Sequence, residues 1–164
     1  MSKVEAKKEQ IIQKVTHYMI LEGLADVGLR KLAAVGGTSD RMLIYYFGTK
    51  DGLIGEAMAT VAAGLSMQLD AVLGEEKRDA QTLLNELYAL NQVPEFNLTI
   101  RLWFEVIGLA VRGREPYASS ALAIAQNWVR WVESRLIEED VPKAKTLFAE
   151  LEGRLMINLI GVEI

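Results

Sequence analysis

Basic and hydroxyl side chains are concentrated between residues 30 and 50, where they can bind an anionic partner. These side chains, with one methionine among them, are Arg30, Lys31, Thr38, Ser39, Arg41, Met42, Tyr45, Tyr46, Thr49 and Lys50. A guanidinium group pairs with O6 and N7 of guanine, whereas lysine and hydroxyl groups bind phosphate oxygens. Arg41 is therefore the candidate base reader, Met42 a candidate contact to a thymine methyl, and the others candidate phosphate contacts. Asp40 would repel phosphate unless it caps a helix or accepts from cytosine N4.

The spacing of the neighbouring residues predicts two short helices joined by a tight turn. Apolar residues recur at helical spacing over 29–33, and Gly36 and Gly37 then supply the backbone freedom that a turn needs. Ser39 is a natural N-cap for a second helix over about 40–47, with two apolar residues one turn apart and facing inward. Two such helices form a helix-turn-helix, a motif that places its second helix in the major groove of DNA.

The rest of the chain predicts further helices and no sheet. The segment from Ser2 to about Leu21 begins with a Ser-x-x-Glu capping box, and Gly23 is its expected C-cap. Thr49 is the expected N-cap of a helix that ends near residue 73. Four more helices are expected over about 79–91, 94–112, 116–139 and 142–160, the last three with proline in the first turn. No segment shows sustained two-residue alternation, so the fold class is all-α.

The residues in and around the predicted helix-turn-helix resemble the N-terminal domain of tetracycline-repressor-type (TetR family) regulators. The resemblance covers 11–53 and is marked by Leu29-Arg30-Lys31-Leu32-Ala33, Gly37-Thr38-Ser39, Tyr45-Tyr46-Phe47-Gly48-Thr49-Lys50 and Leu53. Gly28, Thr38 and Ile44 depart from the residues usual in that family. The resemblance implies a helix-turn-helix DNA-binding domain at 1–50 and a helical ligand-binding and dimerisation domain at 51–164. It also implies a homodimeric repressor that binds a palindromic operator on double-stranded DNA and is released by a small-molecule effector.

Composition agrees with a DNA-binding N-terminal part and gives no sign of an enzyme. Residues 1–50 have a net charge of +3 and the remainder −7, for a total of −4. Local charge decides nucleic-acid binding more than the total does. There is no cysteine, and His17 is the only histidine, so no catalytic, metal or cofactor site is expected. The charged N-terminus is not a signal peptide, and no stretch is apolar enough to span a bilayer, so a cytoplasmic location is expected.

The resemblance also implies a small-molecule pocket among the middle helices. Methionine and aromatic side chains suit an apolar pocket. The candidate lining residues are Met58, Met67, Tyr88, Arg101, Trp103, Phe104, Trp128 and Trp131. The same residues at helical spacing also suit a plain core. Arg101 and Glu105 either make polar contacts in the pocket or form a surface i,i+4 ion pair.

The two C-terminal helices are apolar on more than one side and therefore need partners on more than one side. One partner is the chain's own core, and the other is expected to be a second copy. The candidate interface residues are Ala121, Ala125, Val129, Val132, Leu136, Leu147, Leu151, Leu155 and Leu159. A larger monomer core is the alternative. The apolar ending, Ile160 to Ile164, suggests that a terminal segment is missing.

A second class of function is also consistent with the sequence. The chain could be a helical bundle that binds a small molecule or another protein and keeps only a vestigial DNA-binding motif. Its net charge of −4 and Asp40 in the predicted DNA-reading helix favour this alternative. Salt-dependent binding to duplex DNA distinguishes the two hypotheses, because a protein that contacts phosphates loses affinity steeply as salt rises.

Overall fold

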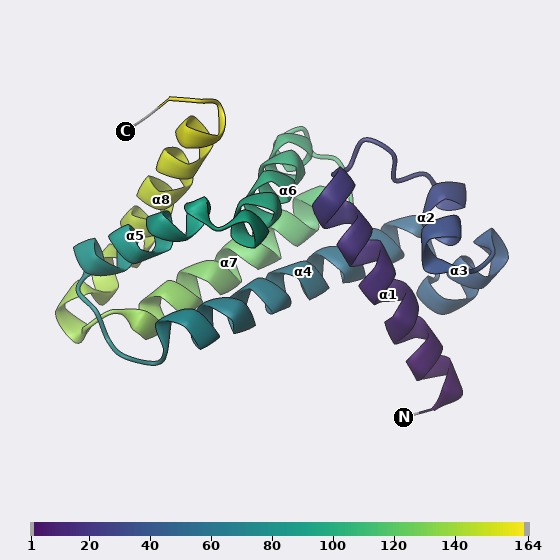
Figure 1. Ribbon diagram of the computed structural model, residues 1–164, viewed down its shortest axis with the longest axis horizontal. Helices are drawn as coiled ribbons and strands as arrows, with labels where there is room; N and C mark the ends of the chain where they lie inside the picture. The colour runs from purple at the N-terminus through teal and green to yellow at the C-terminus, as the bar shows by residue number, and fades with distance from the viewer. Residues whose placement is uncertain (1, 163–164) are drawn as a thin grey trace. The chain divides into compact units, whose positions relative to one another are not determined.

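The computed structural model describes residues 2–162, and within that range every named element is helical. The helices are α1 (Lys3–Glu22), α2 (Leu29–Gly36), α3 (Asp40–Phe47), α4 (Lys50–Leu73), α5 (Ala80–Ala89), α6 (Pro94–Ala110), α7 (Tyr117–Arg135) and α8 (Ala144–Leu159), with short 3₁₀ helices η1 (Leu90–Gln92) and η2 (Glu138–Lys143) (Figure 1). The all-α prediction is confirmed. Ile164, named in the expectation of a missing terminal segment, lies outside the described residues.

Several helix boundaries follow from the capping residues that the sequence predicts. Glu5 N donates to Ser2 Oγ over 3.1 Å and Ser2 N donates to Glu5 Oε2 over 2.6 Å, which completes the capping box of α1. Gly23 ends α1 with φ +72°, and its N–H donates to Met19 O over 3.0 Å. Gly52 N donates to Thr49 Oγ1 over 2.9 Å at the start of α4, which confirms the predicted cap.

The end of α7 differs from the prediction. This helix stops at Arg135 rather than near residue 139, and Pro142 lies inside η2 rather than in the first turn of α8. The cause is a short parallel bridge: Arg78 N donates to Arg135 O and Ile137 N donates to Arg78 O, each over 2.9 Å. The bridge holds the chain extended after α7, and no local sequence pattern predicts a partner so far away.

The chain forms two compact units, each described here by itself. One comprises residues 1–63 and 105–121, and the other 64–104 and 122–164, so that α4, α6 and α7 contribute residues to both. The two units are defined by which residues pack together. The division into a DNA-binding and a ligand-binding domain at residue 50 stays a prediction. No helix within residues 2–162 is long and apolar enough to cross a membrane.

The first unit comprises α1, α2, α3 and the first part of α4, together with the end of α6 and the start of α7. Figure 1 shows α2 and α3 next to each other, with α1 beside them. Its fully buried side chains include Ile11, Val15, Met19, Leu32, Leu43, Leu53 and Ile54. A Cβ on Gly36 would lie only 3.1 Å from Ile11 Cγ2, so glycine allows α2 to pack closely on α1.

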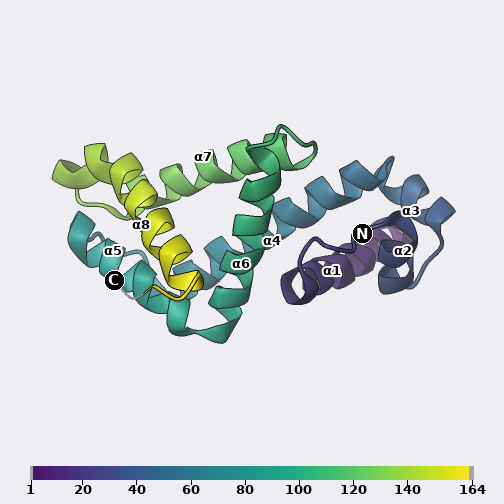
Figure 2. The same ribbon diagram turned by 90° about the horizontal axis from the view of Figure 1, so that it is seen from above.

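The second unit has a core in which α5 and α8 lie side by side (Figure 2). The buried residues of this core are Leu69, Leu83, Leu84, Leu87, Phe96, Val132, Leu136, Ala144, Leu147, Leu151 and Leu155. Burial of each such leucine contributes on the order of 1.5–3 kcal/mol.

Most of the residues predicted for the dimer interface are buried within the single chain. Six of the predicted residues are at most 8 % exposed within the single chain: Ala121, Val132, Leu136, Leu147, Leu151 and Leu155. Their side chains pack within the chain and offer no surface to a second copy. Ala125, Val129 and Leu159 keep partly exposed side chains, and their role in an interface stays a prediction.

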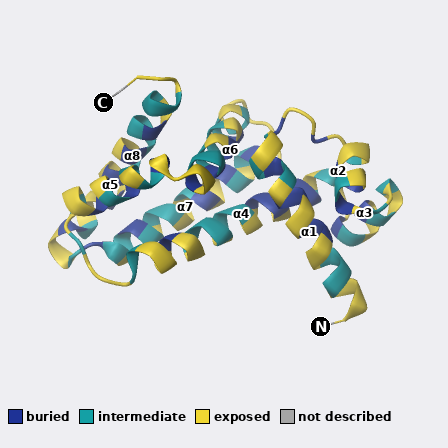
Figure 3. Cartoon of the chain, in the orientation of Figure 1, coloured by how far each residue is buried: buried dark blue, intermediate teal, exposed yellow. Residues whose placement is uncertain are grey.

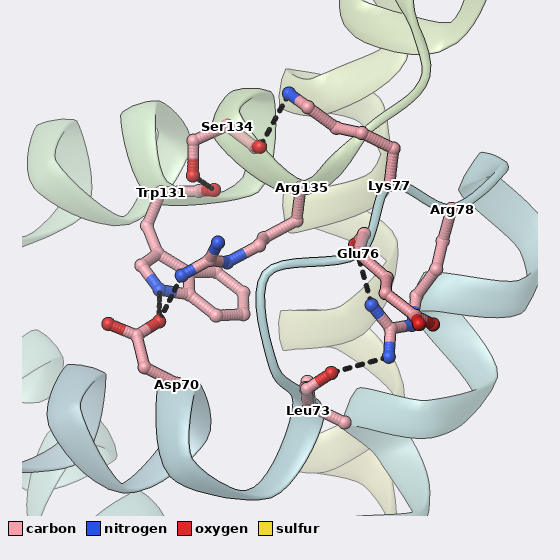
Figure 4. Close-up of polar contacts among 8 residues, drawn as sticks. All are labelled: Asp70, Leu73, Glu76, Lys77, Arg78, Trp131, Ser134 and Arg135. Atoms are coloured by element: carbon pink, nitrogen blue, oxygen red, sulfur yellow. Dashed lines mark hydrogen bonds and ion pairs between the residues drawn. The ribbon is translucent and has the colours of Figure 1, made fainter.

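A polar cluster fixes the end of α4 to the segments around it (Figure 4). Trp131 Nε1 donates to Asp70 Oδ1 over 2.8 Å, and Arg135 forms an ion pair with the same carboxylate. These two contacts, the Trp131 hydrogen bond first, lower the pKa of Asp70. Arg78 Nη2 donates to Leu73 O over 2.6 Å, which satisfies a carbonyl at the C-terminus of α4. This end of α4 is therefore fixed to α7 and to the following loop.

Candidate nucleic-acid interface

The turn between α2 and α3 has the geometry that the paired glycines predict. Gly37 adopts a left-handed conformation (φ +66°, ψ +44°), and its N–H donates to Ala34 O over 3.1 Å. Ser39 Oγ then accepts from Met42 N over 3.3 Å and caps α3. The helix over Asp40–Phe47 has the bounds that the sequence predicts, so the helix-turn-helix geometry is present.

Helix α3 buries one face and exposes the other. Leu43 is 1 % exposed and Phe47 7 %, whereas Tyr45 is 67 % exposed. Arg41 lies one turn before Tyr45 and is also exposed; within residues 2–162 its side chain has no hydrogen bond or ion pair. Figure 3 shows exposed positions along α3. The guanidinium donors of Arg41 are therefore free for an external acceptor.

The junction after α3 holds the second group of predicted contacts. Thr49 caps α4, so its oxygen accepts within the chain while its hydroxyl hydrogen stays available to a phosphate. A Cβ on Gly52 would lie 2.4 Å from Phe47 O, so only glycine lets α4 begin this close to the end of α3. Lys50, the first residue of α4, thus has a fixed position relative to α3.

The lysines near this surface differ in what their ammonium groups contact. Lys8 forms a 2.7 Å ion pair with Glu56 and lies 5.1 Å from the centre of the Phe47 ring, which gives it a structural role. The ammonium of Lys31 lies 5.3 Å from the centre of the Tyr18 ring. These contacts lie within the chain and need no external partner.

Lys14 is the residue that sequence reasoning missed. Its Nζ lies 3.4 Å from the position that a Cβ on Gly37 would occupy, and its side chain is exposed. The structure thus brings a cation from α1 to the turn that precedes α3. No local signal pairs residue 14 with residue 37, because their proximity results from the packing of α1 on α2.

The predicted pocket residues of the second unit are partly brought together. Tyr88, Phe104, Trp128 and Trp131 are half-buried against its core, and the Trp128 and Trp131 rings are 5.6 Å apart. Met67 is 72 % exposed within the single chain, so its side chain is directed to solvent here, and its role in a pocket stays a prediction.

The remaining candidates make polar contacts or lie elsewhere. Met58 is buried in the first unit. Trp103 Nε1 donates to Glu152 Oε2 over 2.8 Å; burial raises the pKa of Glu152, and this hydrogen bond partly opposes the increase. The surface ion pair between Arg101 and Glu105 is not formed: Arg101 Nε donates to Asn97 Oδ1 over 2.7 Å instead. Across the described residues, no three His, Cys, Asp or Glu side chains gather to hold a metal ion.

Comparison with known proteins identifies the fold through solved structures. No family model matches the sequence, and no curated protein matches it either. A protein described as a TetR-family transcriptional regulator from Rhodococcus sp. superposes with a TM-score of 0.73 at 20 % identity, covering 95 % of this chain and 88 % of that one. A protein described as a transcriptional regulator from Streptomyces coelicolor A3(2) gives 0.76 at 21 % identity, covering 96 % and 89 %.

A third similar structure is a complex with a small molecule. The multidrug binding protein EbrR, complexed with proflavin, gives a TM-score of 0.72 at 21 % identity, covering 95 % of this chain and 91 % of that one. The chain therefore has the fold of TetR-family transcriptional regulators, an N-terminal helix-turn-helix followed by a helical C-terminal domain.

Proposed function

We propose that this chain is a DNA-binding transcriptional regulator that acts as a homodimeric repressor and leaves its operator when a small apolar molecule binds. The observation that supports this most directly is the exposed face of α3, where Arg41 is unpaired among the described residues and Tyr45 is 67 % exposed. A helix with a buried apolar face and an unpaired guanidinium outside suits entry into a major groove.

In the proposed complex, α3 reads bases and its two ends bind phosphates. Arg41 pairs with guanine, a contact typically worth about 1–3 kcal/mol of base discrimination. Near the start of α3, Lys14, Thr38 and Ser39 bind the DNA backbone, and beyond its end Lys50 does so. Asp40 lies in the first turn of α3, where a carboxylate is favoured by the helix dipole. Its charge therefore does not exclude DNA binding.

A second copy covers the apolar face that α7 and α8 leave exposed. On α7 this dimer face comprises Leu122, 62 % exposed, with Ala125 and Val129 one and two turns later. On α8 it comprises Met156, 50 % exposed, and directly after the helix it includes Ile160, the C-cap, 75 % exposed. The spacing of three and four residues suits helix–helix packing, and a twofold dimer matches a palindromic operator.

The dimer face has a direct test in solution. Leu122→Glu combined with Met156→Glu places carboxylates in the face without disturbing a buried side chain. Light scattering after size exclusion should give the mass of a dimer for the wild type and of a monomer for the double variant. Glu75→Lys, a charge change at an exposed position in the loop between α4 and α5, lies on neither helix of this face and should leave the dimer intact. A monomeric wild type at micromolar concentration would contradict the dimer.

The effector is proposed from the half-buried aromatic residues and from two structural neighbours. EbrR is complexed with proflavin, and a protein from Saccharomonospora viridis, matched at a TM-score of 0.62 and 17 % identity, is in complex with choline. Tyr88, Phe104 and Trp128 supply apolar surface for a small molecule in the second unit.

Selection of duplex DNA tests the function as a whole. Purified protein is mixed with random duplexes, the retained fragments are sequenced, and the affinity for the enriched sequence is measured against salt concentration. A palindromic motif and a steep decrease in affinity with salt are expected. The alternative is a small-molecule-binding or protein-interaction bundle with a vestigial DNA-binding motif, which the net charge of −4 favours. It predicts that no motif is enriched and that duplex binding is negligible at physiological salt.

A further inference from the structure

The first turn of α3 carries a carboxylate that makes no contact within the fold. Asp40 is the first residue of α3, and its side chain is partly exposed. The cap of the helix is its neighbour Ser39, whose Oγ accepts from Met42 N over 3.3 Å, so Asp40 does not cap α3. Within residues 2–162 the carboxylate of Asp40 has no hydrogen bond or ion pair. Both of its oxygens are therefore free to accept from a partner outside the chain.

A branched apolar side chain lies one turn further along the same side of α3. Ile44 is 39 % exposed, whereas its neighbour Leu43 is 1 % exposed and belongs to the buried face. Residues four apart stand one above the other on a helix, so Asp40 and Ile44 share one side. An exposed isoleucine gains little from packing and is a weaker helix former than alanine or lysine. Its exposed surface is explained if an external partner covers it.

Asp40 and Ile44, here called the acceptor–apolar pair, match the pyrimidine edges of the major groove. A carboxylate is repelled by phosphates, so on DNA it needs a donor, and in the major groove the donors are the amino groups of cytosine and adenine. Adenine carries the N7 acceptor beside its amino group, and this acceptor repels a carboxylate, whereas cytosine presents only its N4 donor. Thymine offers a C5 methyl to an apolar side chain. Residues near the N-terminus of a recognition helix are the ones that reach base edges.

We propose that the acceptor–apolar pair specifies a cytosine and a nearby thymine in each operator half-site. Asp40 accepts from cytosine N4, and Ile44 contacts the thymine methyl. This inference rests on the proposed function and names two bases that the operator must contain. Ile44 lies about 6 Å beyond Asp40 along the helix axis. Successive bases of one strand are about 3.4 Å apart, so the two bases lie within about two positions of each other.

Replacement of Asp40 by asparagine tests the cytosine contact. Asparagine has nearly the same size, but its amide both donates and accepts, so it pairs with N6 and N7 of adenine. Selection from random duplexes with the full chain should give one cytosine for the wild type that becomes adenine for Asp40→Asn, with the other positions unchanged. On duplexes that differ only there, the wild type should bind the cytosine form at least about fivefold more tightly, and Asp40→Asn the adenine form. Asp40→Ala, which has no acceptor, should bind both forms equally.

Deoxyuridine in place of thymidine tests the apolar contact, because this change removes only the C5 methyl group. Each thymine within two positions of that cytosine is replaced in turn in the selected duplex. One replacement should weaken binding by the wild type about fourfold, as expected for the loss of one buried methyl group. Ile44→Ala should bind the thymidine and deoxyuridine duplexes with equal affinity, which separates this contact from any that Met42 makes.

A matched control and the contrary results keep this inference separate from the proposed function. Glu22→Gln removes a carboxylate from an exposed position at the end of α1 and should select the wild-type motif. If Asp40→Asn and Asp40→Ala keep the wild-type preference at every position, the cytosine contact is wrong while the proposed function stands. If Ile44→Ala keeps the sensitivity to deoxyuridine, the thymine contact is wrong in the same way. If the wild type enriches no motif at all, the proposed function itself fails, and the base contacts fail with it.

Discussion

Replacement of Lys14 by glutamine tests whether the cation beside the turn binds a DNA phosphate. The ammonium lies 3.4 Å from the position of a Cβ on Gly37, and no ion pair within the described residues occupies it. Each phosphate that a protein neutralises contributes about 0.9 to the slope of log affinity against log salt concentration. Lys14→Gln should therefore reduce the slope by about 0.9 per copy, or about 1.8 for a dimer.

The same relation gives the expected loss of affinity. At roughly 0.1 M monovalent salt, one lost contact lowers the affinity about eightfold, and two lost contacts about 60-fold. Fluorescence anisotropy of the selected duplex, titrated at several concentrations from about 0.05 to 0.3 M KCl, measures both quantities. Lys145→Gln is the matched control, because it removes the same charge from an exposed position of α8.

Two results would refute this reasoning. If Lys14→Gln and the wild type have the same affinity and the same slope against salt concentration, Lys14 contacts no phosphate. A lower affinity at every salt concentration with an unchanged slope would show that Lys14 acts by supporting the turn.

Further predictions concern base reading, helix packing and pH. Arg41→Ala should reduce discrimination at one base pair by about 1–3 kcal/mol, measured with single-substitution duplexes, and unchanged preference would reject this assignment. Gly52→Ala should destabilise the fold by about 1–3 kcal/mol, because its Cβ would lie 2.4 Å from a backbone carbonyl oxygen, whereas Gly64→Ala in the same helix has open space and should stabilise it by about 0.5–1 kcal/mol in urea unfolding. Burial raises the pKa of Glu152 in the folded state above its unfolded-state value. The neutral carboxyl therefore contributes fully to the free energy of unfolding below the unfolded-state pKa, and this contribution is lost as pH rises through the folded-state pKa. Glu152→Gln should therefore raise Tm at pH 7 but not below about pH 4, and an equal shift at both would contradict this origin.

The features that the sequence predicts well are those set by neighbouring residues. Ser39 and Thr49 cap the helices that follow them, and Gly37 takes the left-handed conformation expected of the turn. The bounds of α3 follow from these local preferences and from the inward spacing of Leu43 and Phe47. The helix-turn-helix could thus be predicted from a stretch of about two dozen residues.

The features that were missed depend on partners far away in the sequence. An apolar stripe shows that Leu147 and Leu151 must be buried, but it does not show which surface they pack against. In the structure both residues pack in the chain's own core. Similarly, the i,i+4 spacing of Arg101 and Glu105 favours an ion pair, yet Glu105 finds a stronger partner in the Leu24 N–H. Backbone donors at a helix end carry no side-chain signature, so such contacts are invisible to pattern analysis.

Helix α1 carries two contacts that fix its position, one at its C-terminus and one beside the turn before α3. Gly23, at its C-terminus, lies against the carboxylate of Glu105, and nine residues earlier Lys14 reaches the turn before α3. These two positions are separated by about 13.5 Å along the helix axis, because nine residues rise by about 1.5 Å each. Displacement at the end of α1 therefore changes the position of the Lys14 ammonium relative to a phosphate at that turn.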